Sequence, residues 1–148
     1  DYYLEHIVLC LSDGLLAQCG IDLDTHRGEI AAGNLSALCD CPFVLGSAED
    51  IGGRIGRGLL RSSGVSPVSK ATSENVETLL ALCEQSVGAC FCPENLLHTA
   101  LSPAQLTHLH ILPLCPEASY PICFGYLSRS YPWSVLSEFI RIAREQTA

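Results

Sequence analysis

The sequence predicts an α/β fold with a mostly parallel five-stranded sheet, because short apolar runs alternate with segments of helical periodicity. The clearest helix follows Ser73 and ends at Gly88, and its apolar residues share one face: Val76, Leu79, Leu80, Cys83 and Val87. The run at 89–92 is too short and apolar for anything but a buried strand. At 148 residues, with 48% hydrophobic and 16% charged content, the chain is long enough to bury a core.

The other predicted elements continue this alternation. The first half contains a strand at 5–11, a short helix ending at Gly20, a surface loop at 21–33, a short helix capped by Asn34, a strand at 42–45, a helix at 51–63 and a strand at 65–71. The second half contains a short helix at 94–100, a strand at 105–112, a connector at 113–119, a strand at 120–127 and a final helix capped by Ser134. Such alternation is typical of a sheet with helices on both faces.

Polar residues follow the third predicted strand, where the clearest helix begins. Thr72, Ser73 and Asn75 offer hydroxyl and amide groups, and the first helical turn adds unpaired N–H groups. Ligands bind outside the carboxyl ends of strands in open α/β sheets, and helix N–H groups favour a carboxylate. The alternative is that Ser73 only caps the helix and Asn75 is only solvated. Glu74 and Glu77 oppose a bare anion, so an amine-bearing ligand stays open.

Charge and hydropathy argue against nucleic acid and membrane as direct partners. The net charge is −8 with only eight Lys and Arg, so the basic patch needed to neutralise phosphates is absent overall. Arg54, Arg57 and Arg61 would share a face of the helix at 51–63, either solvated or as an anion or partner site. No apolar run reaches the ~18–20 residues that span a bilayer. No signal peptide is visible, and without an initiator Met we expect Asp1 to begin a fragment.

The sequence contains nine cysteines, at positions 10, 19, 39, 41, 83, 90, 92, 115 and 123. Several lie inside apolar runs, where a thiol behaves as a small hydrophobic side chain. Their odd number and the absence of a secretion signal favour a reduced, cytoplasmic compartment over a disulfide framework. The pairs Cys39/Cys41, Cys90/Cys92 and His108/His110 lack the spacing of zinc ligands, so we expect no metal site.

No pattern in the chain indicates catalysis or a cofactor. The nucleophile pattern GxSxG is absent, and the glycines at 52, 53, 56 and 58 do not form GxGxxG. One loop holds several acidic residues and a histidine that could resemble a catalytic acid/base cluster: Asp22, Asp24, His26 and Glu29. Charged residues clustered in a loop are usually solvated. We therefore expect no catalytic residue and no cofactor.

Four segments together resemble the effector-binding domain of LysR-type transcriptional regulators. They are LEHIVLCLSDGLL, NLSALCDCPFVL, SENVETLLALCEQSVGACFCPENLL and PWSVLSEFIRIARE, and their order fits across nearly the whole chain. The third is the most diagnostic, with helix, glycine, short strand and proline in succession. Two departures are Ser86 in place of the first family glycine and cysteines in place of the usual aliphatic residues.

The resemblance implies a Rossmann-like, periplasmic-binding-protein-like subdomain at 4–112, a hinge at 113–119, and a strand and helix of a second, incomplete subdomain at 120–148. It implies a non-enzymatic sensor that binds a small effector in an inter-subdomain cleft. The cleft residues would be Thr72, Ser73 and Asn75, with Ser47, Phe91 and Pro93 as further candidates. DNA would be bound only through a helix-turn-helix domain outside this chain, and the apolar helix at 134–146 would drive self-association. The alternatives are a periplasmic-type solute-binding protein and a small cysteine-dependent enzyme.

Overall fold

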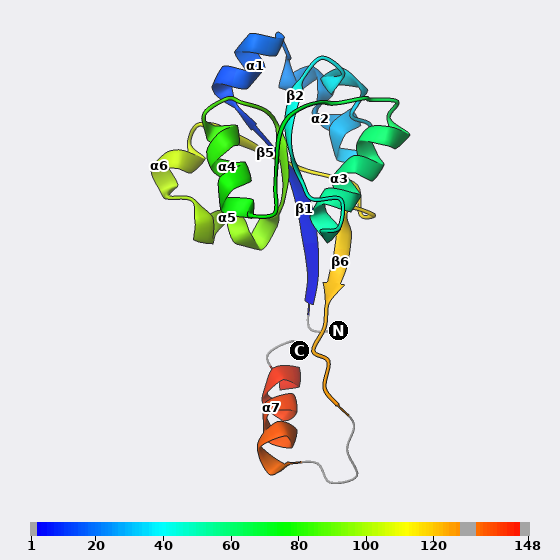
Figure 1. Ribbon diagram of the computed structural model, residues 1–148, viewed down its shortest axis with the longest axis vertical. Helices are drawn as coiled ribbons and strands as arrows, with labels where there is room; N and C mark the ends of the chain where they lie inside the picture. The colour runs from blue at the N-terminus through cyan, green and yellow to red at the C-terminus, as the bar shows by residue number, and fades with distance from the viewer. Residues whose placement is uncertain (1–2, 128–132, 146–148) are drawn as a thin grey trace. The chain divides into compact units, whose positions relative to one another are not determined.

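The computed structural model describes residues 3–127 and 133–145. Residues 6–118 form one compact unit, and the described parts of 1–5 and 119–148 form another. The elements follow in the order β1 (Tyr3–Ser12), α1 (Asp13–Cys19), α2 (Leu23–Ala31), a 3₁₀ turn (Ser36–Leu38), β2 (Pro42–Gly46), α3 (Ile51–Ser62), β3 (Val68–Ser73), α4 (Val76–Glu84), β4 (Cys90–Pro93), α5 (Glu94–Ala100), α6 (Pro103–Leu106), β5 (Leu109–Pro113), β6 (Ser119–Ile122) and α7 (Ser134–Glu145) (Figure 1).

Strands β1, β4, β5 and β6 form one sheet, in which β1 is antiparallel to β4 and β5, and β2 and β3 form a small parallel sheet. This corrects the prediction of a mostly parallel five-stranded sheet. β2 pairs with β3 in parallel, and a parallel bridge joins Phe43 of β2 to Ala89 beside β4. β1 lies between β4 and β5 and is antiparallel to both, and β6 also pairs with β1. β2, β3, β4 and β5 therefore run in one direction and β1 runs against them. A fully apolar strand has the same sequence pattern in either direction, so its pattern could not reveal this.

β1 supplies side chains to both faces of the sheet, and every residue from Ile7 to Leu11 is buried. Alternate residues of a strand point to opposite faces. Val8 and Cys10 join the cluster that packs under α4 and α5, whereas the side chain of Ile7 approaches Gly52 of α3. Figure 1 shows α4 and α5 on one side of the strands and α2 and α3 on the other.

Thiols fill part of the core between the sheet and α4, as the apolar surroundings of these cysteines predict. The sulfur atoms of Cys10 and Cys92 lie 3.6 Å apart, and the Cys83 thiol donates to the Cys10 carbonyl at 3.3 Å. Hydrogen bonding to Cys10 and Cys83, together with burial, raises the pKa of Cys90 above its ordinary value. The thiol of Cys90 is therefore protonated at neutral pH and packs as a small hydrophobic group.

Several elements differ from the sequence-based expectation. The predicted loop at 21–33 contains α2, which begins after the cap Asp22 and buries only Leu23 and Ile30, so its apolar periodicity is weak. The strand predicted at 105–112 starts later, because α6 occupies its beginning; Ser102 and Gln105 close a capping box there. The strand predicted at 120–127 is also shorter, since β6 ends at Ile122.

Candidate functional site

The carboxyl ends of β2, β3 and β4 lie at one edge of the sheet. The register pairs Leu45 with Thr72 and Gly46 with Ser73, so these two strands end side by side. β4 runs parallel to β2, and its last residue, Pro93, therefore faces the same edge. The predicted site residues thus come from three neighbouring strand ends, and a helix begins within a few residues of each.

The loop from β2 into α3 is tightly folded around Ser47. The Ser47 hydroxyl accepts from the Glu49 N–H at 3.2 Å, and its carbonyl accepts from the Asp50 N–H at 3.2 Å. The Asp50 carboxylate caps α3 by accepting from the Gly53 N–H at 3.0 Å. A Cβ atom on Gly53 would lie 2.0 Å from the Ser47 carbonyl oxygen, so this approach of helix to loop requires glycine.

At the start of α4 the cap is Asn75, which corrects the prediction of Ser73. The Asn75 side chain accepts from the Thr78 N–H at 3.0 Å, while the Ser73 hydroxyl accepts from the Asn75 N–H at 3.1 Å. Thr72 and Asn75 are exposed and Ser73 is half-buried, so all three can be reached by a ligand at this edge.

Phe91 and Pro93 occupy different environments. The Phe91 ring is buried and stacks on Phe43, with ring centroids 5.9 Å apart and an interplanar angle of 11°. It also packs directly against Gly56 of α3. Pro93 is half-buried and precedes α5. Phe91 thus supports the edge from the core, whereas Pro93 lies on it. The role of the six predicted residues in ligand binding stays a prediction.

Acidic residues accompany both helix N-termini at this edge. Glu49 and Asp50 precede α3, and Glu74 and Glu77 flank the start of α4. Asp50 is engaged as a cap, and carboxylates near a helix N-terminus are stabilised by the helix dipole. An incoming anion would meet the remaining N–H groups together with these carboxylates. The arrangement therefore suits a ligand that carries hydrogen-bonding groups besides a carboxylate.

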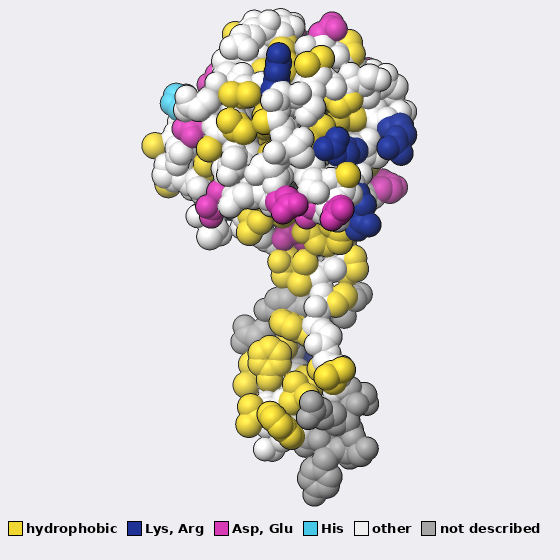
Figure 2. Space-filling model, viewed as in Figure 1, with side chains coloured by type: hydrophobic (Ala, Val, Ile, Leu, Met, Phe, Trp, Pro, Cys, Tyr) yellow, Lys and Arg dark blue, Asp and Glu magenta, His cyan; other side chains and the backbone are white. Residues whose placement is uncertain are grey.

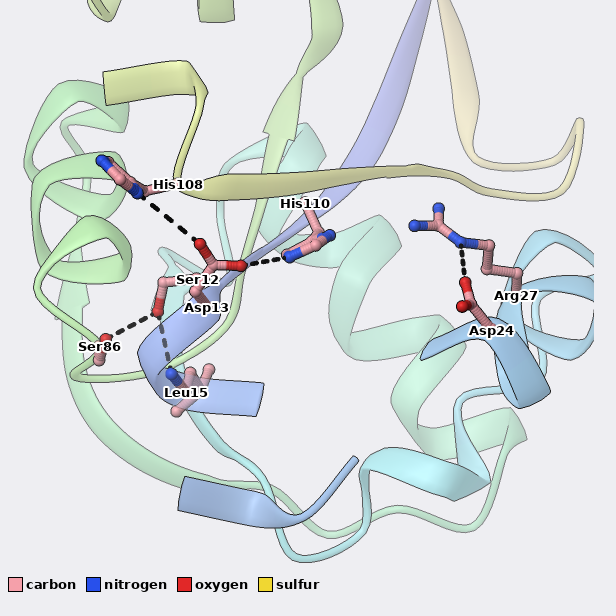
Figure 3. A network of polar contacts seen from close by, with 8 residues as sticks. All are labelled: Ser12, Asp13, Leu15, Asp24, Arg27, Ser86, His108 and His110. Atoms are coloured by element: carbon pink, nitrogen blue, oxygen red, sulfur yellow. Dashed lines mark hydrogen bonds and ion pairs between the residues drawn. The ribbon is translucent and has the colours of Figure 1, made fainter. Parts of the chain in front are cut away.

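A second polar cluster, at the opposite end of β1, could not be found from the sequence (Figure 3). Asp13 lies between two histidines: its carboxylate is 2.6 Å from His110 Nε2 and 3.7 Å from His108 Nδ1. The hydrogen bond from His110, reinforced by both imidazoles, lowers the pKa of Asp13. The only available signal was a pair of histidines two residues apart, far along the chain from Asp13.

The same cluster gives a role to Ser86, which stands where the sequence pattern usually has its first glycine. Ser86 adopts a left-handed conformation with φ of 61°, which is the reason that glycine is common at such helix ends. Its hydroxyl hydrogen-bonds to Ser12 Oγ at 2.8 Å, and Ser12 in turn caps α1 by accepting from the Leu15 N–H (Figure 3). This side-chain contact is one that glycine could not make.

Among the described residues, no group of three or more His, Cys, Asp or Glu side chains is arranged to hold a metal ion. Within the same part of the chain, no helix is long and apolar enough to cross a bilayer.

Comparisons with known proteins identify a family and a fold. The family model "LysR substrate binding domain" matches residues 3–148. HinK, a LysR family transcriptional regulator from Pseudomonas aeruginosa, is 16% identical and has a TM-score of 0.65, and the match covers 99% of this chain and 46% of that one. The CcmR regulatory domain of Synechocystis PCC6803 in complex with 2-PG is 12% identical, with a TM-score of 0.65 and coverages of 99% and 64%.

The effector-binding domain of QuiR in complex with shikimate is 11% identical, with a TM-score of 0.61 and coverages of 97% and 62%. This chain thus spans less than two thirds of each of these three structures. No curated protein matches its sequence. Identities this low show a shared fold, and the family match carries the assignment.

Replacing Gly53 by Ala should destabilise the loop between β2 and α3. The new methyl group would overlap the Ser47 carbonyl, and we expect a loss of about 1–3 kcal/mol in the free energy of unfolding, measured by urea denaturation. Gly58→Ala, in the same helix with open space around its Cα, is the matched control and should gain about 1 kcal/mol. Equal effects of the two variants would contradict the tight approach.

The Asp13–His110 contact predicts a pH dependence of stability. Folding lowers the pKa of Asp13, so ionised Asp13 stabilises the folded chain. Its contribution to the free energy of unfolding is complete above its unfolded pKa of about 4 and is lost as the pH falls through the lower folded pKa. Urea midpoints should therefore differ between wild type and Asp13→Asn at about pH 5 and converge towards about pH 2. His110→Gln should reproduce the pattern, and the double variant should add nothing. Parallel curves would refute the linkage.

Proposed function

The chain belongs to the LysR substrate-binding domain family, and we propose that it senses a small carboxylate-bearing metabolite at the edge formed by the ends of β2, β3 and β4. Membership makes it an effector-binding domain of LysR-type regulators, which is not an enzyme. The same membership excludes the two alternatives, a periplasmic-type solute-binding protein and a cysteine-dependent enzyme.

One observation supports the proposed location of the site. The parallel register places Ser73 beside Gly46, and α3 and α4 begin within a few residues of these strand ends. N–H groups in the first turn of a helix have no partner inside the helix and favour a negatively charged group. Ser47 and Ser73 add hydroxyl groups at the same edge, which supports a ligand with both a carboxylate and other polar groups.

The ligand class follows from the chemistry of this edge. Two relatives of similar fold were solved with shikimate and with 2-PG, which are small metabolites. Glu74 and Glu77 repel a bare anion, but as carboxylates they accept hydrogen bonds. A ligand that carries hydroxyl groups besides its carboxylate could donate hydrogen bonds to them. An amine-bearing metabolite would use the same carboxylates as ion-pair partners and is the second candidate.

We propose that effector binding favours one of two conformational states of a longer regulator. A ligand can shift such an equilibrium only by its difference in affinity between the states. In this proposal residues 4–112 are one regulatory subdomain, 113–119 are the hinge and 120–148 contribute to the other. Binding to DNA would belong to a helix-turn-helix domain of the longer protein, which would act in the cytoplasm.

The face of α7 supports self-association. Val135, Phe139 and Ile142 of α7 are exposed, and so is Trp133, which directly precedes the helix. The Phe139 ring makes an edge-to-face contact with the exposed Phe124, with ring centroids 5.4 Å apart. Exposed apolar side chains gathered in this way mark interaction surfaces. We propose that a second copy of this chain covers this face.

Binding of carboxylate metabolites should depend on Ser73. We expect backbone amide signals of the chain to shift saturably when shikimate or another hydroxylated carboxylate is titrated, with the largest shifts at 47–53 and 73–78. Ser73→Ala should weaken binding about tenfold, since it removes one hydrogen bond to a charged group. Ser69→Ala, at the other end of β3, is the matched control and should keep the affinity. Loss of affinity in both variants, or in neither, would place the site elsewhere.

Charge on the apolar face of α7 should abolish self-association. Phe139→Glu is expected to give monomers by light scattering at concentrations where the unmodified chain forms dimers or larger species, because burying a carboxylate there is costly. Ser137→Glu adds the same charge to the exposed polar side of the helix and should leave association intact. A monodisperse monomer of the unmodified chain at high concentration would count against the proposal.

A further inference from the structure

A cavity of about 410 Å³ lies beside the C-terminal half of α3, where the chain leaves the helix for β3. It is lined by Arg57, Leu60, Arg61, Gly64, Val65, Ser66 and Pro67. Its volume is within the range of about 300–1,000 Å³ that is usual for small-molecule sites. The lining belongs to the second half of α3 and the segment after it, whereas the edge described above uses the N-terminus of α3.

Positive charge is concentrated at this cavity in an acidic protein. The chain has only eight Lys and Arg against sixteen Asp and Glu, yet Arg54, Arg57 and Arg61 all lie on α3. Figure 2 shows dark blue side chains gathered over this helix, with acidic side chains nearby. Arg57 and Arg61 line the cavity and none of its lining residues is acidic. In the described part of the chain, neither of these arginines forms an ion pair with a carboxylate.

The guanidinium group of Arg57 is only partly satisfied. Its Nη2 donates to the Gly46 carbonyl at 3.0 Å, but its buried Nε finds no acceptor among the described residues. A buried donor without a partner costs free energy, and such groups in proteins normally have one. The planar guanidinium group matches the paired oxygens of a carboxylate or phosphate, so an anion in the cavity would draw this side chain toward it.

The remaining walls limit what else the ligand carries. Leu60 is fully buried, and Val65 and Pro67 add apolar surface to the cavity, while Ser66 offers a hydroxyl group. Ligand sites commonly combine such apolar walls with a few converging polar groups. A compact anionic head with a short body fits this combination.

From the cavity, the paired arginines and the unsatisfied donor, we infer a second anion-binding site on α3, in which Arg57 and Arg61 hold the carboxylate or phosphate group of a small molecule. This site is separate from the proposed effector edge and does not depend on it. The two sites are neighbours, because Arg57 donates a hydrogen bond to the carbonyl of Gly46, which directly precedes the Ser47 loop of the effector edge.

The test is a titration of the isotope-labelled 148-residue chain, followed by its backbone amide signals. Inorganic phosphate and succinate are added separately, with chloride adjusted to hold the ionic strength constant. We expect saturable shifts at Gly64, Val65 and Ser66, and the anion with the tighter binding identifies the head group. Shifts confined to 47–53 and 73–78 would assign the anion to the effector edge and would overturn the second site, as would linear shifts without saturation.

Two arginine variants separate a built site from general charge. Arg61→Gln removes a charge-assisted hydrogen bond and should weaken binding about tenfold. Arg54→Gln removes the same charge from the same helix outside the cavity, and the affinity should stay near that of the unmodified chain. Arg57→Lys keeps the charge without the planar fork and should also weaken binding. Equal weakening by Arg54→Gln and Arg61→Gln, or none by Arg61→Gln, would overturn the proposal.

Discussion

The position of β1 between two strands that run against it is the constraint on which residues 6–118 depend. Because β1 is paired on both edges and covered on both faces, Ile7 to Leu11 must all be apolar. One set of side chains meets the thiols under α4, and the other meets the glycine-rich start of α3. The strand also ends in Ser12, whose hydroxyl caps α1 and contacts Ser86, so the same element anchors the polar cluster.

Helix α3 separates charge along its length. Asp50 caps its N-terminus, and the arginines of its second half lie towards its C-terminus, so both follow the helix dipole. The buried glycines on its inner face let the helix approach the Ser47 carbonyl and the Phe91 ring closely. Close packing at one end and a cavity at the other give one helix two distinct environments, an acidic edge and a basic pocket.

Elements with strong local signals could be predicted. The short strand after Gly88 occurs where its sequence pattern places it. α4 buries Leu79, Leu80 and Cys83 of the predicted stripe, but it ends at Glu84 rather than at Gly88 and leaves Val87 outside the helix. Asn75 and Ser73 were correctly located at the start of α4. Which of them caps the helix depends on where β3 ends, and the pairing of β3 with β2 sets that end at Ser73. α2 was missed because a mostly exposed helix with two buried residues has little periodicity to detect.

The sequence by itself determined the order of elements, the apolar faces of the helices, the strand ends that could hold a ligand, and the resemblance to the LysR effector-binding family. These features depend on residues close together in the chain, whose spacing reports the local conformation. Only the tertiary structure decided the direction of β1, the stacking of Phe91 on Phe43 and the pairing of Asp13 with His110, 97 residues away. Such contacts are selected by which surfaces pack together, and no local pattern encodes that choice.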